Sequence, residues 1–166
     1  MKILIIGHAR HGKDTVASFI KEEFGLTHMS SSEAALQLFA YDLLRDKCGY
    51  QSKEECFEDR LNHRSEWYDM ICEYNSKDQS RLAKDLLGMV DIYVGMRSDE
   101  ELSECIENDL FGHIIAVYDP RKELEPESSM SIDIHKRASH IILNDGTLWE
   151  LKERTTSLFK KILKNG

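Results

Sequence analysis

A glycine-bounded loop near the amino terminus constrains the fold of this chain more than any other feature. The residues from Gly7 to Lys13 read GHARHGK, which has the spacing G-x-x-x-x-G-K. An apolar run over residues 2–6 precedes the loop, and apolar side chains recur at helical spacing from Val16 to Phe24. A strand, a glycine-bounded loop and a helix in this order are the context in which such a spacing binds phosphate. The sequence therefore predicts a phosphate-binding P-loop between a buried strand and a helix.

The chemistry of such a loop comes from main-chain N–H groups, the positive end of a helix and one lysine ammonium. Lys13 is expected to reach the β- and γ-phosphates of a nucleoside triphosphate. The next position normally holds a Ser or Thr that coordinates Mg²⁺, but here it is Asp14, followed by Thr15. Both offer oxygen to a hard cation, so we expect ATP and Mg²⁺ as cofactors. The expected nucleotide-binding residues are Gly7, Arg10, His11, Gly12, Lys13, Asp14 and Thr15, with Asp14 and Thr15 also expected to hold the metal.

Composition narrows the class of protein. The chain has 166 residues, 41% of them hydrophobic and 31% charged, which fits one soluble globular domain. No apolar run approaches the roughly 20 residues that cross a bilayer, and the first strand leaves no room for a signal peptide. The net charge of −8 argues against a general nucleic-acid-binding surface. Four cysteines without C-x-x-C spacing indicate reduced thiols, so we expect a cytoplasmic protein (in the host cell if viral) with no membrane partner.

Strand and helix signals alternate along the chain. Short apolar runs predict strands over residues 2–6, 26–30, 91–95, 113–118 and 140–143, and the segments between them carry helical periodicity. We expect Ser31 or Ser32 to cap the helix after the second strand. Ser52 with Glu55, and Ser98 with Glu101, have the spacing of capping boxes. Helices are further predicted from Ser52 as one helix or a broken pair, from Ser76 to Leu87, from Ser98 to about Leu110, and from Thr147 to the end of the chain.

This alternation predicts an α/β fold with a parallel sheet covered on both faces. Ligands of such sheets bind beyond the carboxyl ends of the strands. We therefore expect one group of residues along the carboxyl edge of the sheet: the P-loop, Ser30 to Ser32, Arg97, Asp119 to Arg121 and Asn144.

Three segments resemble the nucleoside monophosphate kinases, and most closely the bacteriophage deoxynucleoside monophosphate kinases. The first is the Gly12-Lys13-Asp14-Thr15 form of the loop. The second is the run from Tyr93 to Arg97, whose arginine serves the phosphates in that family. The third is the last strand with its Asn-Asp-Gly turn, from Ile141 to Thr147. The related 5-hydroxymethyluridine DNA kinases are a second point of likeness.

The resemblance implies a three-layer P-loop kinase fold with a five-stranded parallel sheet in the order 2-3-1-4-5. It implies one domain over residues 1–166, with a core of 1–31 and 90–166, a helical acceptor-binding insert of about 32–89 and a short lid segment over 121–137. It also implies ATP, Mg²⁺ and a deoxynucleotide acceptor. Lys13 and Arg97 are then the expected catalytic residues, and Arg121 and Asn144 join the nucleotide-binding set.

Acceptor-binding residues are expected at two places. Arg60 and Arg64 have the i, i+4 spacing of one helical face, where two guanidinium groups hold a phosphate or, alternatively, pair with neighbouring carboxylates in solvent. Trp67 either stacks on a base or packs in the core. The run Ser30, Ser31, Ser32 and Glu33 ends the second strand, where it caps a helix, contacts the acceptor, or both, and Glu33 would be the general base if the acceptor is a hydroxyl.

Three functions are compatible with these patterns. The first is a deoxynucleoside monophosphate kinase that uses ATP. The second is a kinase that phosphorylates the hydroxymethyl group of 5-hydroxymethyluridine in viral DNA, after flipping the base into a pocket. The third, of another class, is a nucleotide-binding switch without catalysis.

Overall fold

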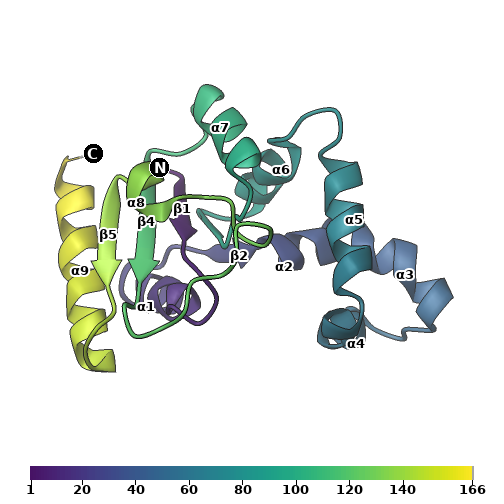
Figure 1. The fold of residues 1–166 in the computed structure, drawn as a ribbon, viewed down its shortest axis with the longest axis horizontal. Helices are drawn as coiled ribbons and strands as arrows, with labels where there is room; N and C mark the ends of the chain where they lie inside the picture. The colour runs from purple at the N-terminus through teal and green to yellow at the C-terminus, as the bar shows by residue number, and fades with distance from the viewer. Residues whose placement is uncertain (166) are drawn as a thin grey trace.

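The sheet of the computed structural model, which describes residues 1–165, has five parallel strands in the order β2-β3-β1-β4-β5 (Figure 1). This confirms the α/β class and the strand order implied by the family resemblance. Every neighbouring pair runs parallel, with β1 between β3 and β4. The bounds are Ile3–Ile6 for β1, His28–Ser30 for β2, Ile92–Val94 for β3, His113–Tyr118 for β4 and His140–Leu143 for β5.

Alternate residues of the central strand β1 face two separate apolar layers. Ile3 and Ile5 pack with α1 (Lys13–Phe24) and α9 (Leu148–Asn165). Leu4 and Ile6 pack with α6 (Arg81–Met89) and α7 (Asp99–Glu107) on the other face. A strand with helices on both sides buries every side chain, which explains the continuous apolar run in the sequence.

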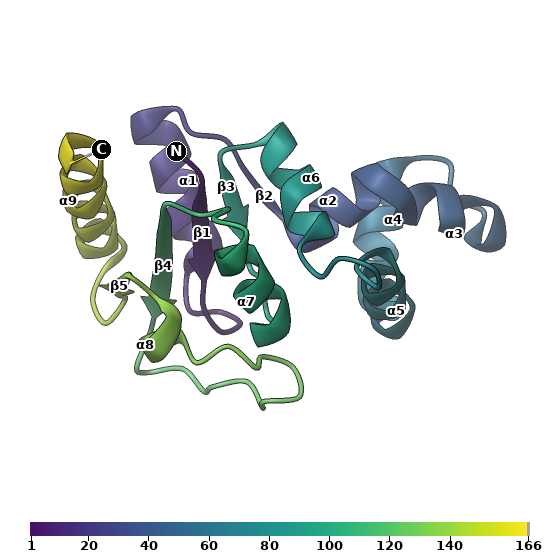
Figure 2. The same cartoon turned by 90° about the horizontal axis from the view of Figure 1, so that it is seen from above.

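A helical protrusion extends beyond the β2 edge of the sheet (Figures 1 and 2). Its small core is separate from the two layers at the sheet. The expected insert of about 32–89 is too wide, because Ala34 and α6 belong to the core on the sheet. The elements are α2 (Ser31–Ala35), the π-helix η1 (Leu36–Ala40), α3 (Tyr41–Cys48), α4 (Lys53–Asp59), the 3₁₀ turn η2 (Arg60–Asn62) and α5 (Arg64–Tyr74).

Several predicted helix boundaries differ from the structure for local reasons. Ser30, and not Ser31 or Ser32, caps α2, because the last residue of β2 already has the extended backbone of an N-cap. The helix expected from Ser76 begins only at Arg81. The intervening residues form turns, since side-chain oxygens of Asn75 and Asp78 accept main-chain N–H bonds there.

The lid segment (residues 121–137) leaves the sheet after β4 and returns through the short helix α8 (Ile134–Arg137), which the sequence did not predict. Figure 2 shows its path below α7. Its second half is anchored, because Met130, Ile132 and Ile134 are buried in the same apolar layer as α6 and α7. Within residues 1–165, no helix combines the length and the apolar character needed to cross a bilayer.

Candidate functional site

The P-loop has a backbone that only small residues permit at two positions. A Cβ on Gly7 would lie 2.7 Å from the carbonyl oxygen of Val117, so the loop leaves β1 against β4 without room for a side chain. Gly12 has a φ of +99°, and a Cβ there would lie 2.7 Å from Nδ2 of Asn144. Arg10, with a φ of +66°, also adopts the left-handed conformation. Turns of this kind are what a phosphate-binding loop uses to present main-chain N–H groups to an anion, and α1 begins directly after Gly12.

Lys13 is held inside the protein, with 9% of the residue exposed. Its stem packs against Gly95 at the end of β3, where an added Cβ would lie 3.3 Å from the lysine Cε. Burial lowers the pKa of Lys13, although the carboxylates of Asp14 and Glu125 act in the opposite direction. The charged ammonium of Lys13 has lost contact with water, and the nearby carboxylates replace that stabilisation only in part. An anion that binds beside it would supply the rest.

A carboxylate from the lid segment already lies on the P-loop. Oε2 of Glu125 accepts the main-chain N–H of Ala9 at 2.7 Å, and Oε1 accepts a guanidinium N–H of Arg97 at 2.5 Å. Burial opposes ionisation of Glu125, but the bonds from Arg97 and Ala9 outweigh it and lower its pKa. The loop therefore binds an anionic group of its own chain, through donors that a phosphate would use.

We expect Glu125→Gln to bind inorganic tripolyphosphate about tenfold more tightly than the unchanged protein, a gain of about 1.4 kcal/mol. The physical reason is that the carboxylate of Glu125 competes with the ligand for Ala9 and Arg97. Isothermal titration calorimetry measures the change, and Glu127→Gln, an exposed residue of the same segment, is the matched control. Equal or weaker binding by Glu125→Gln would show that the carboxylate does not compete.

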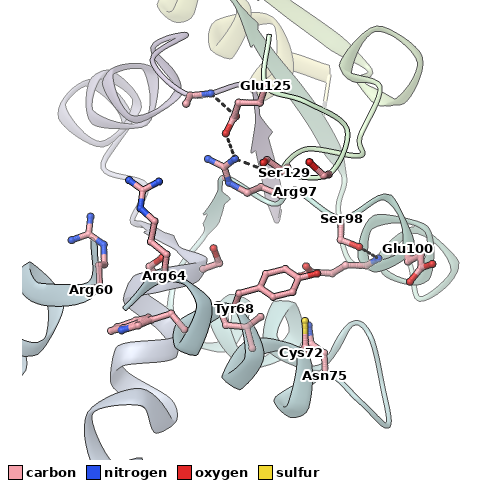
Figure 3. A pocket seen from close by; sticks show the side chains of 18 of the residues that line it. Arg60, Arg64, Tyr68, Cys72, Asn75, Arg97, Ser98, Glu100, Glu125 and Ser129 are labelled. Atoms are coloured by element: carbon pink, nitrogen blue, oxygen red, sulfur yellow. Dashed lines mark hydrogen bonds and ion pairs between the residues drawn. The ribbon is translucent and has the colours of Figure 1, made fainter. Parts of the chain in front are cut away.

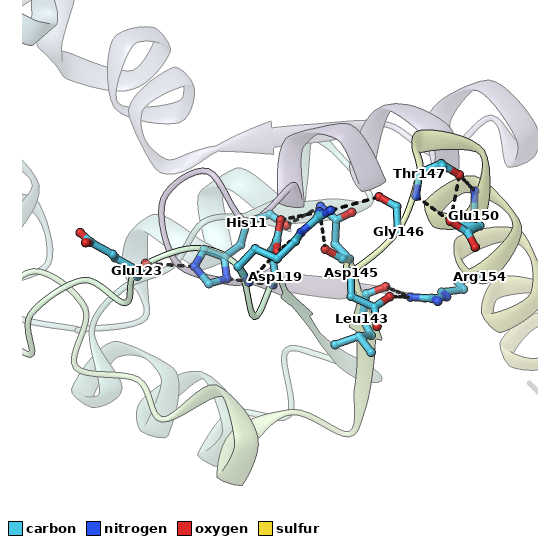
Figure 4. A network of polar contacts seen from close by, with 11 residues as sticks. His11, Asp119, Glu123, Leu143, Asp145, Gly146, Thr147, Glu150 and Arg154 are labelled. Carbon is cyan, nitrogen blue, oxygen red and sulfur yellow. Dashed lines mark hydrogen bonds and ion pairs between the residues drawn. The ribbon is translucent and has the colours of Figure 1, made fainter.

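Two histidines of the P-loop, His8 and His11, bind the chain at the base of the lid segment, and Figure 4 shows the contacts of His11. Nδ1 of His8 accepts the main-chain N–H of Glu125 at 3.0 Å, and Nδ1 of His11 accepts that of Asp119 at 3.0 Å. Nε2 of His11 donates to the carbonyl of Glu123 at 3.1 Å. Burial lowers the pKa of His8, which keeps its Nδ1 available as an acceptor. His11, expected to bind nucleotide, has its ring turned to the lid.

Arg121 and Asn144 lie at the carboxyl ends of β4 and β5, where they hold neighbouring segments together. The guanidinium of Arg121 donates twice to Asp119, each bond 2.9 Å long, and once to the carbonyl of Asn144. These bonds lower the pKa of Asp119 to about 2. The amide of Asn144 donates to the carbonyl of His11 at 3.1 Å, so it supports the P-loop from behind.

A cavity of about 710 Å³, the central cavity, adjoins the P-loop between α5 and α7. Figure 3 shows the guanidinium groups of Arg60, Arg64 and Arg97 at the end nearer Glu125. The opposite end carries neutral and acidic groups. Sequence-predicted residues that line the cavity are Ser31, Ser32, Arg60, Arg64, Trp67 and Arg97.

The two arginines of the protrusion reach the cavity from different elements. The prediction of one helical face is wrong, because the backbone breaks at His63, leaving Arg60 in η2 and Arg64 at the start of α5. Arg60 lies 3.8 Å over the ring of Phe57 and donates to its carbonyl. Neither arginine forms an ion pair with a carboxylate of residues 1–165, so the alternative of a solvated ion-pair face is not observed.

Three further predicted residues have mixed outcomes. Glu33 and Ser30 form a capping box at α2, through bonds of 2.7 and 3.2 Å, and neither lines the central cavity. Trp67 was expected either to pack in the core or to stack on a base. It is buried in the protrusion core against Phe57, and it also lines the cavity. Its Nε1 is the one fully buried side-chain polar atom of the described chain that lacks a hydrogen-bond partner.

The sequence missed a buried pair in the wall of the cavity. Glu101 and Tyr93 are both almost inaccessible, and the tyrosine hydroxyl donates to Oε1 of Glu101 at 3.1 Å. Ser98 caps α7 as predicted, accepting the main-chain N–H of Glu101. The carboxylate, however, is turned to Tyr93 and does not complete the capping box. Burial raises the pKa of Glu101 to about 7.

Comparison with known proteins informs the fold. The sequence matches no protein-family model and no curated protein. A dephospho-CoA kinase from Campylobacter jejuni has a TM-score of 0.56 at 15% identity, covering 97% of this chain and 96% of its own. The protein TT1252 from Thermus thermophilus has a TM-score of 0.55 at 16% identity, with 97% of each chain covered. This chain has the P-loop kinase fold.

The family resemblance implies Mg²⁺ with the nucleotide, and the donors present here fit that ion. Asp14 and Thr15 offer a carboxylate and a hydroxyl in the first turn of α1, directly after the P-loop. No group of three or more His, Cys, Asp or Glu side chains suited to a metal occurs within the described range. Mg²⁺ needs no such cage, because it binds through one or two protein oxygens, phosphates and water.

Proposed function

We propose that this protein is an ATP-dependent kinase that phosphorylates a deoxynucleoside monophosphate. The observation that carries the proposal is that the P-loop and a group of arginines, both suited to bind anions, adjoin the same cavity. A P-loop with a buried lysine opens into a cavity whose nearer end holds three guanidinium groups. One site suits the phosphates of a donor and the other suits the phosphate of an acceptor.

Phosphoryl transfer depends mainly on positioning and on stabilising charge, and these residues supply both. In the proposed reaction, the P-loop and Lys13 hold the donor phosphates, while Arg60 and Arg64 hold the acceptor. An acceptor phosphate oxygen attacks the γ-phosphorus of ATP, the bond to the β-phosphate oxygen breaks, and ADP leaves. Asp14 and Thr15 would hold Mg²⁺, which would supply positive charge to neutralise the phosphates. A phosphate acceptor needs no general base, in agreement with the capping role of Glu33.

The proposal places the protein in the cytoplasm, where ATP and reduced thiols are found. The four free cysteines support this location, because disulfides are rare in the cytosol.

The test is incubation with γ-labelled ATP and a panel of acceptors. The panel contains each deoxynucleoside monophosphate, the nucleosides, unmodified duplex DNA and DNA carrying 5-hydroxymethyluridine. Label in a deoxynucleoside diphosphate is the expected result. Label found only in hydroxymethylated DNA would favour the DNA kinase instead, and nucleotide binding without transfer to any acceptor would favour a switch.

Arg64→Ala is expected to raise the acceptor KM about tenfold or more, with a smaller effect on the KM for ATP. The reason is that the guanidinium of Arg64 faces the cavity without a protein partner among residues 1–165, so its charge is available to a ligand phosphate. Steady-state kinetics with both substrates varied measure the two constants. Arg45→Ala, in α3 of the same protrusion and outside the cavity lining, is the control. An unchanged acceptor KM would remove Arg64 from the acceptor site.

A further inference from the structure

We propose that Glu101 determines the base specificity of the acceptor site, by pairing through its ionised carboxylate with guanine. This inference rests on the proposed function, and it adds the chemical class of the base. It concerns the end of the central cavity opposite the guanidinium groups.

The carboxylate of Glu101 is buried but incompletely bonded. Glu101 is 7% exposed and lines the cavity. Its Oε1 accepts the hydroxyl of Tyr93, whereas Oε2 has no hydrogen-bond partner within residues 1–165. Oε2 is also not among the fully buried unpaired atoms of that range, so it reaches accessible surface. The cavity is the surface that the residue lines, and a ligand there meets a free acceptor oxygen.

A structural role alone does not explain this placement. The sequence assigns Glu101 to a capping box, but the carboxylate leaves the cap and points to Tyr93. No cation of the described residues lies within 4 Å to form an ion pair with it. A buried carboxylate without a cation costs folding free energy, and burial raises its pKa to about 7. Groups placed at such a cost concentrate where a ligand uses them.

The cavity is polarised along its length. Figure 3 places Arg60, Arg64 and Arg97 at one end, and Ser98 and Glu100 toward the other. An acceptor whose phosphate lies on the guanidinium groups extends its base toward α7. Glu101, in the first turn of α7, is then a wall residue on the base side.

Carboxyl chemistry selects among the bases. An ionised carboxylate accepts two adjacent donors from guanine, the ring N1–H and the amino group. Each of the other bases presents one donor and one acceptor along that edge: cytosine and adenine an amino group beside a ring nitrogen, thymine an N3–H beside a carbonyl oxygen. An ionised carboxylate would set its oxygen against that acceptor in a buried site, which is costly. A protonated carboxyl donates one bond and accepts one, so it pairs with cytosine, adenine and thymine.

The first test compares kcat/KM for dGMP, dCMP, dAMP and dTMP in the unchanged protein, Glu101→Gln and the control Glu107→Gln, an exposed residue of α7. At pH 8 we expect the unchanged protein and the control to prefer dGMP over the other three nucleotides by about 100-fold. Glu101→Gln should reduce this preference at least tenfold, because its amide donates one bond and accepts one. Absence of a preference for dGMP in the unchanged protein, or an unaltered ranking in Glu101→Gln, would overturn the inference.

The second test uses pH and needs no variant. Between pH 6 and 8 the KM for dGMP should fall, because guanine pairs with the ionised carboxylate, and the KM for dCMP should rise, because cytosine pairs with the protonated form. A structural role would move both constants in the same direction, and that result would contradict the inference. Glu101→Gln should abolish the opposite trends.

Folding of the variant is checked by thermal melting at pH 8. The raised pKa of Glu101 means that its stability cost grows as pH rises from about 4.5 to about 7, so the amide should melt no lower there. If the unchanged protein labels no deoxynucleoside monophosphate, the proposed function fails together with this inference. If it labels them without a preference for dGMP, only the inference fails.

Discussion

Lys13→Met is expected to reduce kcat/KM about 1000-fold or more, the loss typical of removing a charge-stabilising group from a buried active site. The methionine keeps the length of the stem that packs against Gly95 and removes only the ammonium. No other cation of the described P-loop is buried as Lys13 is, so we expect no neighbour to replace its proposed contact with the transferred phosphoryl group. Lys13→Ala should show the same loss of transfer.

The fold should survive this change, and the sign of the pKa shift of Lys13 explains why. Burial lowers that pKa, so folding with the lysine charged carries a cost at neutral pH that the methionine removes. We therefore expect Lys13→Met to melt at the same temperature as the unchanged protein or above it. Initial rates with labelled ATP and circular dichroism melting provide the two measurements, with the exposed Lys21→Met in α1 as control. Retained turnover in a folded variant would refute the P-loop assignment.

Arg97→Ala should lower kcat about 100-fold or more, with a smaller change in either KM. Arg97 follows β3, its guanidinium donates to Glu125 of the lid segment, and it lines the central cavity beside the P-loop. That position is between the proposed donor and acceptor phosphates, where negative charge is redistributed during transfer. An interaction used mainly in the transition state appears in kcat.

Arg97→Lys distinguishes charge from geometry at this position. Lysine keeps the positive charge but cannot donate two parallel bonds, so we expect partial activity between that of Arg97→Ala and the unchanged protein. Rapid-quench measurement of a single turnover isolates the transfer step from product release. A loss confined to the ATP KM would instead limit Arg97 to nucleotide binding.

Local patterns predicted the framework of the molecule well. The glycine spacing and the apolar run before it predicted the βα unit at the amino terminus, and the order of the sheet follows the family resemblance. Boundaries in the protrusion were less predictable. No proline or glycine marks the break in the helix at His63, so the sequence gives no signal for it. The helix α6 begins later than predicted because the side chains of Asn75 and Asp78 accept main-chain N–H bonds before it.

The candidate site was predicted in part. Arg60, Arg64, Trp67, Ser31, Ser32 and Arg97 do meet at one cavity, whereas Glu33 and Ser30 are engaged in a helix cap. Arg60 and Arg64 reach the cavity although the helical face that suggested them does not exist. Their proposed roles now rest on the cavity and on the kinetic tests above.

The sequence by itself predicted the P-loop, the parallel sheet and the edge at which we expect ligands, because strand periodicity and glycine spacing act over a few neighbouring residues. Only the tertiary structure decided which charged side chains meet. Glu125 reaches Ala9 across 116 positions of the chain, and Glu101 leaves its helix cap for Tyr93 on the neighbouring strand. A carboxylate has the same local preferences wherever it lies, so its partner depends on the packing of distant segments, and that packing places acidic groups at both ends of the proposed site.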